Sequence, residues 1–189
     1  MPNVIDCAAV FDPVKILQDH TSPSAQLPHS VSSGTSSTDS WIPLKYSGRS
    51  YVFFLAPSAN VATTSSQDAL EASNDLRIIA KVADTLRFRV ASLALRCDHQ
   101  CFVEQIDIAS GAQCITEPTL QQRASVSTMV DASVSTLDQV KPTDIIDSCW
   151  EFTATQAGLA AANMKFRIYD DKAALRGNFV CTIWYMVQP

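Results

Sequence analysis

The residues from Leu86 to Arg96 constrain the fold most, because apolar and basic side chains alternate along them. Successive side chains of a β-strand point to opposite faces of a sheet, so this alternation predicts a strand with one buried and one polar face. The apolar side holds Leu86, Phe88 and Val90, and the basic side holds Arg87 and Arg89.

The alternation slips by one residue near Ala91 and Ser92. Beyond the slip, Leu93 and Leu95 continue the apolar side and Arg96 continues the arginine side. One extra residue in a strand is typical of a β-bulge, so we expect a bulge at this point.

Further stretches alternate in the same way or are rich in aromatic and β-branched residues, as strands are. They are Ser50–Leu55, Asp75–Val82, Phe102–Ile108, the run that begins at Trp150, Met164–Ile168 and Phe179–Val187. The last of these is apolar on both faces, which predicts a central strand covered on both sides. Parallel α/β folds need a helix of about ten residues or more between strands, and most of the gaps hold none. The sequence therefore predicts an all-β fold, a two-sheet β-sandwich.

Two or three short helices are expected beside the strands. Asp12 is a suitable N-cap and Pro13 suits the first helical position. Ser65 and Asp68 resemble a capping box for a second short helix. Apolar residues from Val126 to Leu137 follow helical spacing and predict a third helix.

The chain divides by composition near residue 40. Residues 1–40 are expected to form an extended N-terminal arm or linker, because Ser, Thr and Pro dominate from Thr21 to Ser40. Residues 41–189 are expected to form the sandwich domain.

The charge content limits the partners of the chain. Charged residues make up 17% of the chain and the net charge is −5, against a typical charged share of about 25%. No basic tail is present, so the usual electrostatic footprint of a nucleic-acid binder is missing. No apolar run approaches the ~20 residues of a membrane span, and no membrane partner is expected. The low charge fits a surface hidden against partners or one covered by Ser and Thr, and both interpretations stay open.

The cysteines offer one candidate metal site. On an extended chain Cys97, His99 and Cys101 share a face, and Cys114 is available as a fourth zinc ligand. The spacing differs from that of the usual zinc knuckles. We favour the alternative, a polar turn at 98–100 between two reduced, buried cysteines.

The arginine row has three possible roles. Arg87, Arg89 and Arg96 are suited to phosphate contact, to ion pairs with acids of a neighbouring chain, or to a solvated strand face. No aromatic residues are interleaved with them, so base stacking is not supported.

Catalytic motifs are missing from the sequence. The three histidines, His20, His29 and His99, lie in the leading segment or in a turn. No Gly-x-Ser-x-Gly elbow and no glycine-rich phosphate loop is present. We therefore expect no enzymatic activity and no cofactor.

The run Leu-Arg-Phe-Arg-Val-Ala-Ser-Leu-Ala-Leu-Arg (Leu86–Arg96) resembles a strand of the coat proteins of small icosahedral RNA viruses. The closing stretch Phe179–Pro189 is similar to their last strand, and the Ser/Thr/Pro arm before Trp41 is similar to their N-terminal arms. The resemblance covers about two-thirds of the chain, and its motifs are strand patterns rather than invariant chemistry.

This resemblance implies a jelly-roll-like β-sandwich and a capsid protein that assembles with copies of itself around a viral genome. It implies a virion location, with host cytoplasm during assembly, and viral RNA or other capsid proteins as further partners. The arm lacks the basic residues that many coat proteins carry. Inner-face cations such as Arg123 or Lys141, counter-ions or another protein would then neutralise the RNA.

Two other functions remain open from the sequence. One is an accessory or decoration protein that docks on a larger particle. The other is a β-sandwich binding module, such as a carbohydrate reader with an aromatic cluster of Trp41, Tyr46 and Tyr51.

Overall fold

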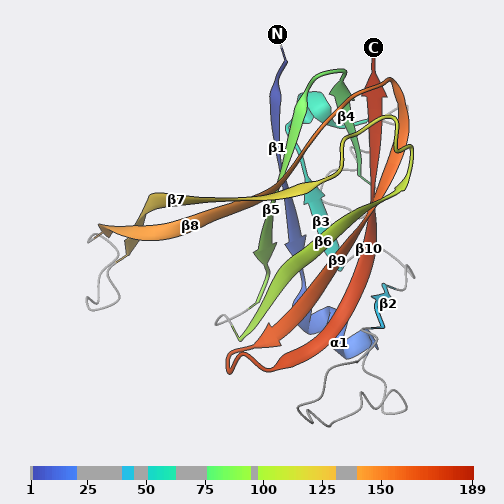
Figure 1. Ribbon diagram of the computed structural model, residues 1–189. Coiled ribbons are helices and arrows are strands. Elements are labelled where there is room, and N and C mark those ends of the chain that lie inside the picture. Colours follow the sequence, from blue (N-terminus) through green and yellow to red (C-terminus); the bar gives the residue numbers. More distant parts are fainter. Residues whose placement is uncertain (1, 21–39, 45–50, 63–75, 95–97, 131–139) are drawn as a thin grey trace.

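The computed structural model describes residues 2–20, 40–44, 51–62, 76–94, 98–130 and 140–189. The described chain is all-β in class: two mixed sheets pack face to face, with a single short α-helix at one end (Figure 1). The predicted all-β class is therefore confirmed.

The first sheet has the strand order β3-β1-β5-β8-β7. Its strands are β1 (Val4–Phe11), β3 (Val52–Leu55), β5 (Thr85–Ser92), β7 (Thr119–Val130) and β8 (Val140–Thr153). β1 runs parallel to β5, and the other neighbours are antiparallel. Because β5 pairs with β8 only at Thr85–Phe88, most of β8 has β7 as its sole neighbour in the sheet among the described strands.

The second sheet has the strand order β2-β10-β9-β6, with β4 also pairing to β10. Its strands are β2 (Ile42–Pro43), β4 (Arg77–Lys81), β6 (His99–Ser110), β9 (Gly158–Asp170) and β10 (Leu175–Gln188). β2 and β4 run parallel to β10, whereas β9 is antiparallel to both β10 and β6. A short 3-10 helix, η1 (Ser58–Asn60), precedes β4.

The core fills the space between the sheets with every second side chain of the long strands, as a pleated sheet requires. Phe166 of β9 packs between Phe11 of β1 at 4.4 Å and Phe179 of β10 at 5.8 Å between ring centroids. Farther along, Phe152 lies edge-on to Tyr185 at 5.1 Å. All of these rings are buried.

The helix predicted after Asp12 is confirmed as α1 (Pro13–His20). The Asp12 carboxylate accepts a hydrogen bond from the backbone N–H of Lys15 at 2.9 Å, which is N-capping of the helix. Ile16 and His20 face the core from α1. The helix predicted from Ser65 lies outside the described residues.

The segment expected to be an arm contains part of the sandwich. β1 alternates exposed and buried side chains and pairs with β3 and β5, so residues 4–11 lie inside the first sheet. Residues 21–39 lie outside the described part. The jelly-roll arrangement is not confirmed, because jelly rolls are antiparallel and three strand pairs here are parallel.

The strand predicted from Leu86 is confirmed as β5, but it ends at Ser92 and Leu93 is exposed. The slip near Ala91 marks this end and not a bulge. Register shifts occur instead in β6, between Val103 and Gln105 and between Ile108 and Ser110.

The helix predicted at Val126–Leu137 is wrong for its described part, because Val126 to Val130 belong to β7. β7 pairs with β8 in unbroken register from Thr119–Glu151 to Val130–Val140. Cross-strand pairing overrides the helical spacing of a few apolar residues. β10 is central as predicted, but its face away from the core is only partly covered, and Trp184 is 46% exposed.

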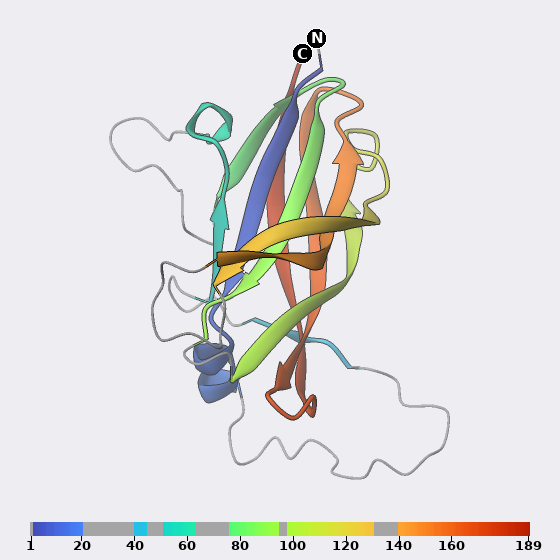
Figure 2. The same ribbon diagram turned by 90° about the vertical axis from the view of Figure 1, so that its left-hand side faces the viewer.

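The β7–β8 hairpin projects from the body of the sandwich. Figure 1 shows the two strands leaving the first sheet sideways, and Figure 2 shows them crossing in front of the other strands. The second sheet does not follow them, so the far part of the hairpin has no layer over it among the described residues.

Candidate functional site

The inner face of the projecting hairpin continues the core-facing side of the first sheet. On β8 that side carries Phe152 and Trp150, which are buried, and then Ile146, which is exposed. On β7 the same side carries Leu120 and Val126, because Leu120 pairs with Trp150 and alternate residues share a face. The hairpin thus carries core-type residues beyond the edge of the second sheet, interspersed on the same face with the polar Gln122, Ser148 and Asp144.

These side chains are open to solvent where the second sheet ends. Val126 is 63% and Ile146 65% exposed, although their strand positions match those of buried residues nearer the body. A hollow of about 440 Å³ lies along this part of the hairpin. Its lining residues are Ala124, Ser125, Val126, Asp144, Ile145 and Ile146. We call the side chains of Leu120, Val126 and Ile146 the uncovered face.

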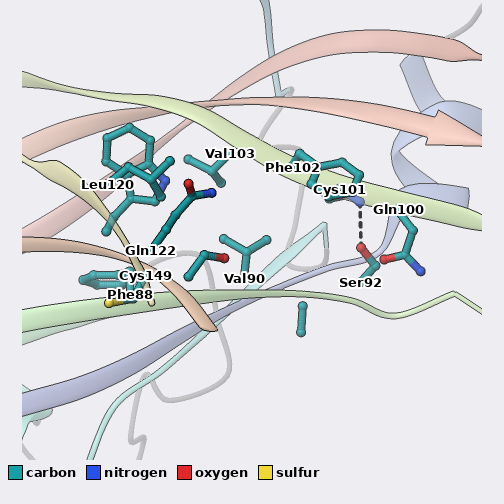
Figure 3. A pocket seen from close by; sticks show the side chains of 13 residues that line it. Phe88, Val90, Ser92, Gln100, Cys101, Phe102, Val103, Leu120, Gln122 and Cys149 are labelled. Atoms are coloured by element: carbon teal, nitrogen blue, oxygen red, sulfur yellow. Dashed lines mark hydrogen bonds between the residues drawn. The ribbon is translucent and has the colours of Figure 1, made fainter. Parts of the chain in front are cut away.

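A cleft between the sheets leads from the core to this face. It has a volume of about 280 Å³ and lies where β5, β7 and β8 diverge from β6. Figure 3 shows Gln122 between Val90 and Val103 in this cleft. Ser92 closes its far end by accepting a hydrogen bond from the backbone N–H of Cys101 at 2.7 Å. This volume lies just below the range of about 300–1,000 Å³ that is usual for ligand pockets. We therefore regard the cleft as the inner end of the uncovered face and not as a separate ligand site.

The opposite, outer face at the base of the hairpin is polar and ion-paired. Arg87 of β5 binds Glu151 of β8 at 2.7 Å. Arg89 binds Asp6 of β1 at 2.8 Å and Asp147 of β8 at 3.1 Å. These pairs join β1, β5 and β8, so they hold the hairpin to the sheet at its base.

The structure places the predicted arginines in this network. Arg87, Arg89 and Arg123 line one small hollow together with Asp147. Lys141 lies farther along the hairpin, opposite Met129, and Arg96 is outside the described residues. The acids that pair with the arginines belong to the same chain. This arrangement weakens the case for phosphate contact, because Arg87 and Arg89 already have carboxylate partners.

The pKa of Asp147 is lowered, first by the hydrogen bond from Arg89 and then by the positive charges of Arg89, Arg123 and Arg87. A carboxyl with a lowered pKa stabilises the folded state above its ordinary pKa, and this contribution disappears as the pH falls through the lowered value. The carboxyl is exposed, so the effect is small. Asp147→Asn should therefore lower the thermal midpoint slightly at neutral pH and leave it unchanged in acid. Thermal unfolding of both proteins from neutral to acidic pH tests this, and an equal difference at every pH would contradict it.

The candidate zinc ligands do not come together. Cys97 is outside the described residues, and His99 and Cys101 begin β6 whereas Cys114 follows its end. An extended strand rises about 3.4 Å per residue, so β6 holds the two cysteines far apart. Within the described ranges, no three His, Cys, Asp or Glu side chains are grouped as a metal site.

Burial makes three of the described cysteines unreactive. It raises the pKa of the Cys7, Cys101 and Cys181 thiols to about 12. Because the thiolate is the reactive form, a rise of about three pH units cuts reactivity roughly a thousandfold at mildly alkaline pH. We expect these three thiols to resist alkylation in the folded protein and to react fully in denaturant, as peptide mass spectrometry can measure. Fast labelling of Cys181 in the folded protein would contradict this.

The other candidate groups have structural roles. His20 Nδ1–H donates a hydrogen bond to the Ile16 carbonyl oxygen at 2.9 Å, and the ring packs edge-on against Tyr51. His29 and Tyr46 lie outside the described residues. The cations of Lys165 and Arg167 lie over the ring of Trp41. Trp41 and Tyr51, the two described residues of the predicted aromatic cluster, do not pack against each other. In the described part of the chain, no helix has the length and apolar character needed to cross a membrane.

Together these observations define a β-sandwich with a projecting hairpin whose inner face has no cover among the described residues. A family model for PixA inclusion body proteins matches residues 3–184, so the chain belongs to the PixA inclusion body protein family. A crystal structure of an inclusion body protein (PixA) from Burkholderia cenocepacia has 20% sequence identity and a TM-score of 0.69. That alignment covers 99% of this chain and 97% of the other, which supports the same fold.

Other comparisons add little. The solution structure of amebosin has 11% identity and a TM-score of 0.24 over 61% of this chain and 90% of the other. A search of curated proteins found no match.

The family assignment corrects the resemblance to viral coat proteins. The chain belongs to a family of inclusion body proteins, so the predicted capsid function and virion location are wrong. The shared pattern of Leu86–Arg96 is that of any half-buried strand, and Arg87 and Arg89 form ion pairs within this chain on the outer face of the sheet. Ile146 was not predicted as a site residue, and Val126 was predicted to be helical. Leu120, Ala124 and Val126 share one strand face, but Gln122 between them weakens that pattern.

Proposed function

We propose that this chain is a structural protein that associates with copies of itself and is stored in a bacterial inclusion body. The observation that carries the proposal is the uncovered face, where core-type side chains continue beyond the second sheet. Val126 and Ile146 on this face are about two-thirds exposed. Burying the exposed two-thirds of such a side chain stabilises an association by roughly 1–2 kcal/mol.

The family supports the same conclusion, since its model describes inclusion body proteins. The low charged share of 17% also favours self-association, because it weakens the repulsion between copies. The function needs no catalytic step and no cofactor.

Sedimentation velocity over a series of concentrations tests the proposal. We expect the full chain to shift from small species to large oligomers as its concentration rises, and the shift to persist at high salt because the contact is apolar. A chain that stays monomeric throughout the series would contradict the proposal.

A further inference from the structure

The exposed edges of the two sheets differ in how well they are protected against pairing with another chain. Proteins protect edge strands by making them short, by placing charges or proline in them, or by bulges. β3 has four residues, β2 has two including Pro43, and β4 has a charged residue at each end. β6 is long, but it has two register shifts and carries Glu104 and Asp107.

Among the described residues, β7 lacks this protection. It is an edge strand of 12 residues whose register with β8 is unbroken. It contains no proline, and Arg123 is its only charged residue. Arg123 lies opposite Asp147, which offsets its charge. The outer edge of β8 in the same hairpin holds Lys141, Pro142 and Asp144 and is protected.

The area of the uncovered face indicates that a second contact is needed. Twelve residues at about 3.4 Å each, on two strands about 4.8 Å apart, give a face roughly 40 Å long and 10 Å wide. The resulting ~400 Å² per copy is about half of the ~800 Å² that each partner buries in a standard stable interface. Pairing two hairpins edge to edge along β7 would join two such faces into one of about 800 Å² per dimer, which reaches that size.

We propose that β7 pairs antiparallel with β7 of a second copy around a two-fold axis, which joins the two hairpins into one four-stranded sheet. This inference rests on the proposed self-association. Because this edge contact is symmetric about a two-fold axis, it joins two copies and cannot add a third. The axis is perpendicular to the sheet, so the uncovered faces of both copies lie on the same side of it. Stacking of these joined faces then links dimers to one another. Fully aligned stacking would close at a tetramer, so growth to a large body requires an offset stack in which the two faces of one dimer meet two different dimers.

Disulfide trapping tests the edge contact. Single cysteines are placed at the exposed positions Gln122, Arg123, Ala124 and Ser125, each in a full chain with Cys97→Ser. Directly opposed residues of antiparallel strands have Cα atoms about 4.5–5.5 Å apart, within the range for a disulfide. Ala109→Cys in the protected edge strand β6 is the matched control, because Ala109 is also exposed.

We expect mild oxidation to give a covalent dimer in high yield at the β7 position nearest the axis, and little dimer at Ala109→Cys. Equal yields in β7 and β6 would overturn the edge pairing. If the wild-type chain forms oligomers and no β7 cysteine is trapped, the edge pairing is wrong and the proposed function stands. If the wild-type chain forms no oligomers, both are wrong.

Discussion

Aspartate at both Val126 and Ile146 is expected to stop assembly at the dimer. Full burial of such a side chain contributes roughly 1.5–3 kcal/mol; both are about two-thirds exposed, so the pair contributes about 2–4 kcal/mol to the contact between dimers. This corresponds to about thirtyfold or more in the dissociation constant. Two carboxylates in the contact weaken it further, because burying an unpaired charge is costly. Light scattering and sedimentation velocity of Val126→Asp/Ile146→Asp should show nothing larger than the dimer.

Leu159→Asp is the control for this variant. Leu159 lies at the start of β9 and is 60% exposed, close to the values for Val126 and Ile146, but it is outside the uncovered face. We expect the control to assemble like the wild-type chain. Large particles of the double variant at wild-type concentrations would show that another surface drives assembly.

Phe166→Ala is expected to give the largest loss of stability. The Phe166 side chain is fully buried and lies between Phe11 of the first sheet and Phe179 of its own sheet. Removing a buried phenylalanine ring costs about 3–5 kcal/mol, because the transfer energy is lost and a cavity remains. A domain is stable by only about 5–15 kcal/mol in total. Urea unfolding should show a much lower midpoint or a chain that is already partly unfolded.

Phe166→Leu is the conservative comparison and should cost much less, because it keeps most of the buried volume. Both variants are measured at concentrations where the chain does not assemble, so that association does not add to stability. A loss below about 1 kcal/mol for Phe166→Ala would contradict the packing of the two sheets around this ring.

The sequence predicted the elements in which local pattern and tertiary pairing agree. Phe166 and Ile168 alternate with Lys165 and Arg167, and the structure buries the first pair in β9. Asp12 and Pro13 predicted α1, because capping depends only on neighbouring residues.

Long-range pairing explains the elements that were missed. β1 alternates Ile5, Cys7, Ala9 and Phe11 toward the core, but small residues weaken that pattern, and its parallel partner β5 is some 80 residues away. β7 is rich in Ser and Thr, and only its pairing with β8 identifies it as a strand. Whether such a segment forms a strand depends on its cross-strand neighbours and not on its own residues alone.

The candidate site was predictable only in part. Arg87 and Arg89 were identified as one face of a strand, which the structure confirms. Glu151, the partner of Arg87, lies in the strand predicted from Trp150, but Asp6 and Asp147, the partners of Arg89, lie outside the predicted strands. The uncovered face depends on where the second sheet ends relative to the first, and local sequence patterns carry no information about that.

Hydroxyl-radical footprinting of the full chain tests the central claim most directly. It compares the oxidation rates of Val126 and Ile146 in dilute solution and in the assembled particles, with Leu159 as the internal reference. Sister molecules that cover the hairpin should protect Val126 and Ile146 strongly in the particles and leave Leu159 unchanged. If Val126 and Ile146 oxidise as fast in the particles as in dilute solution, the hairpin face is not the assembly surface.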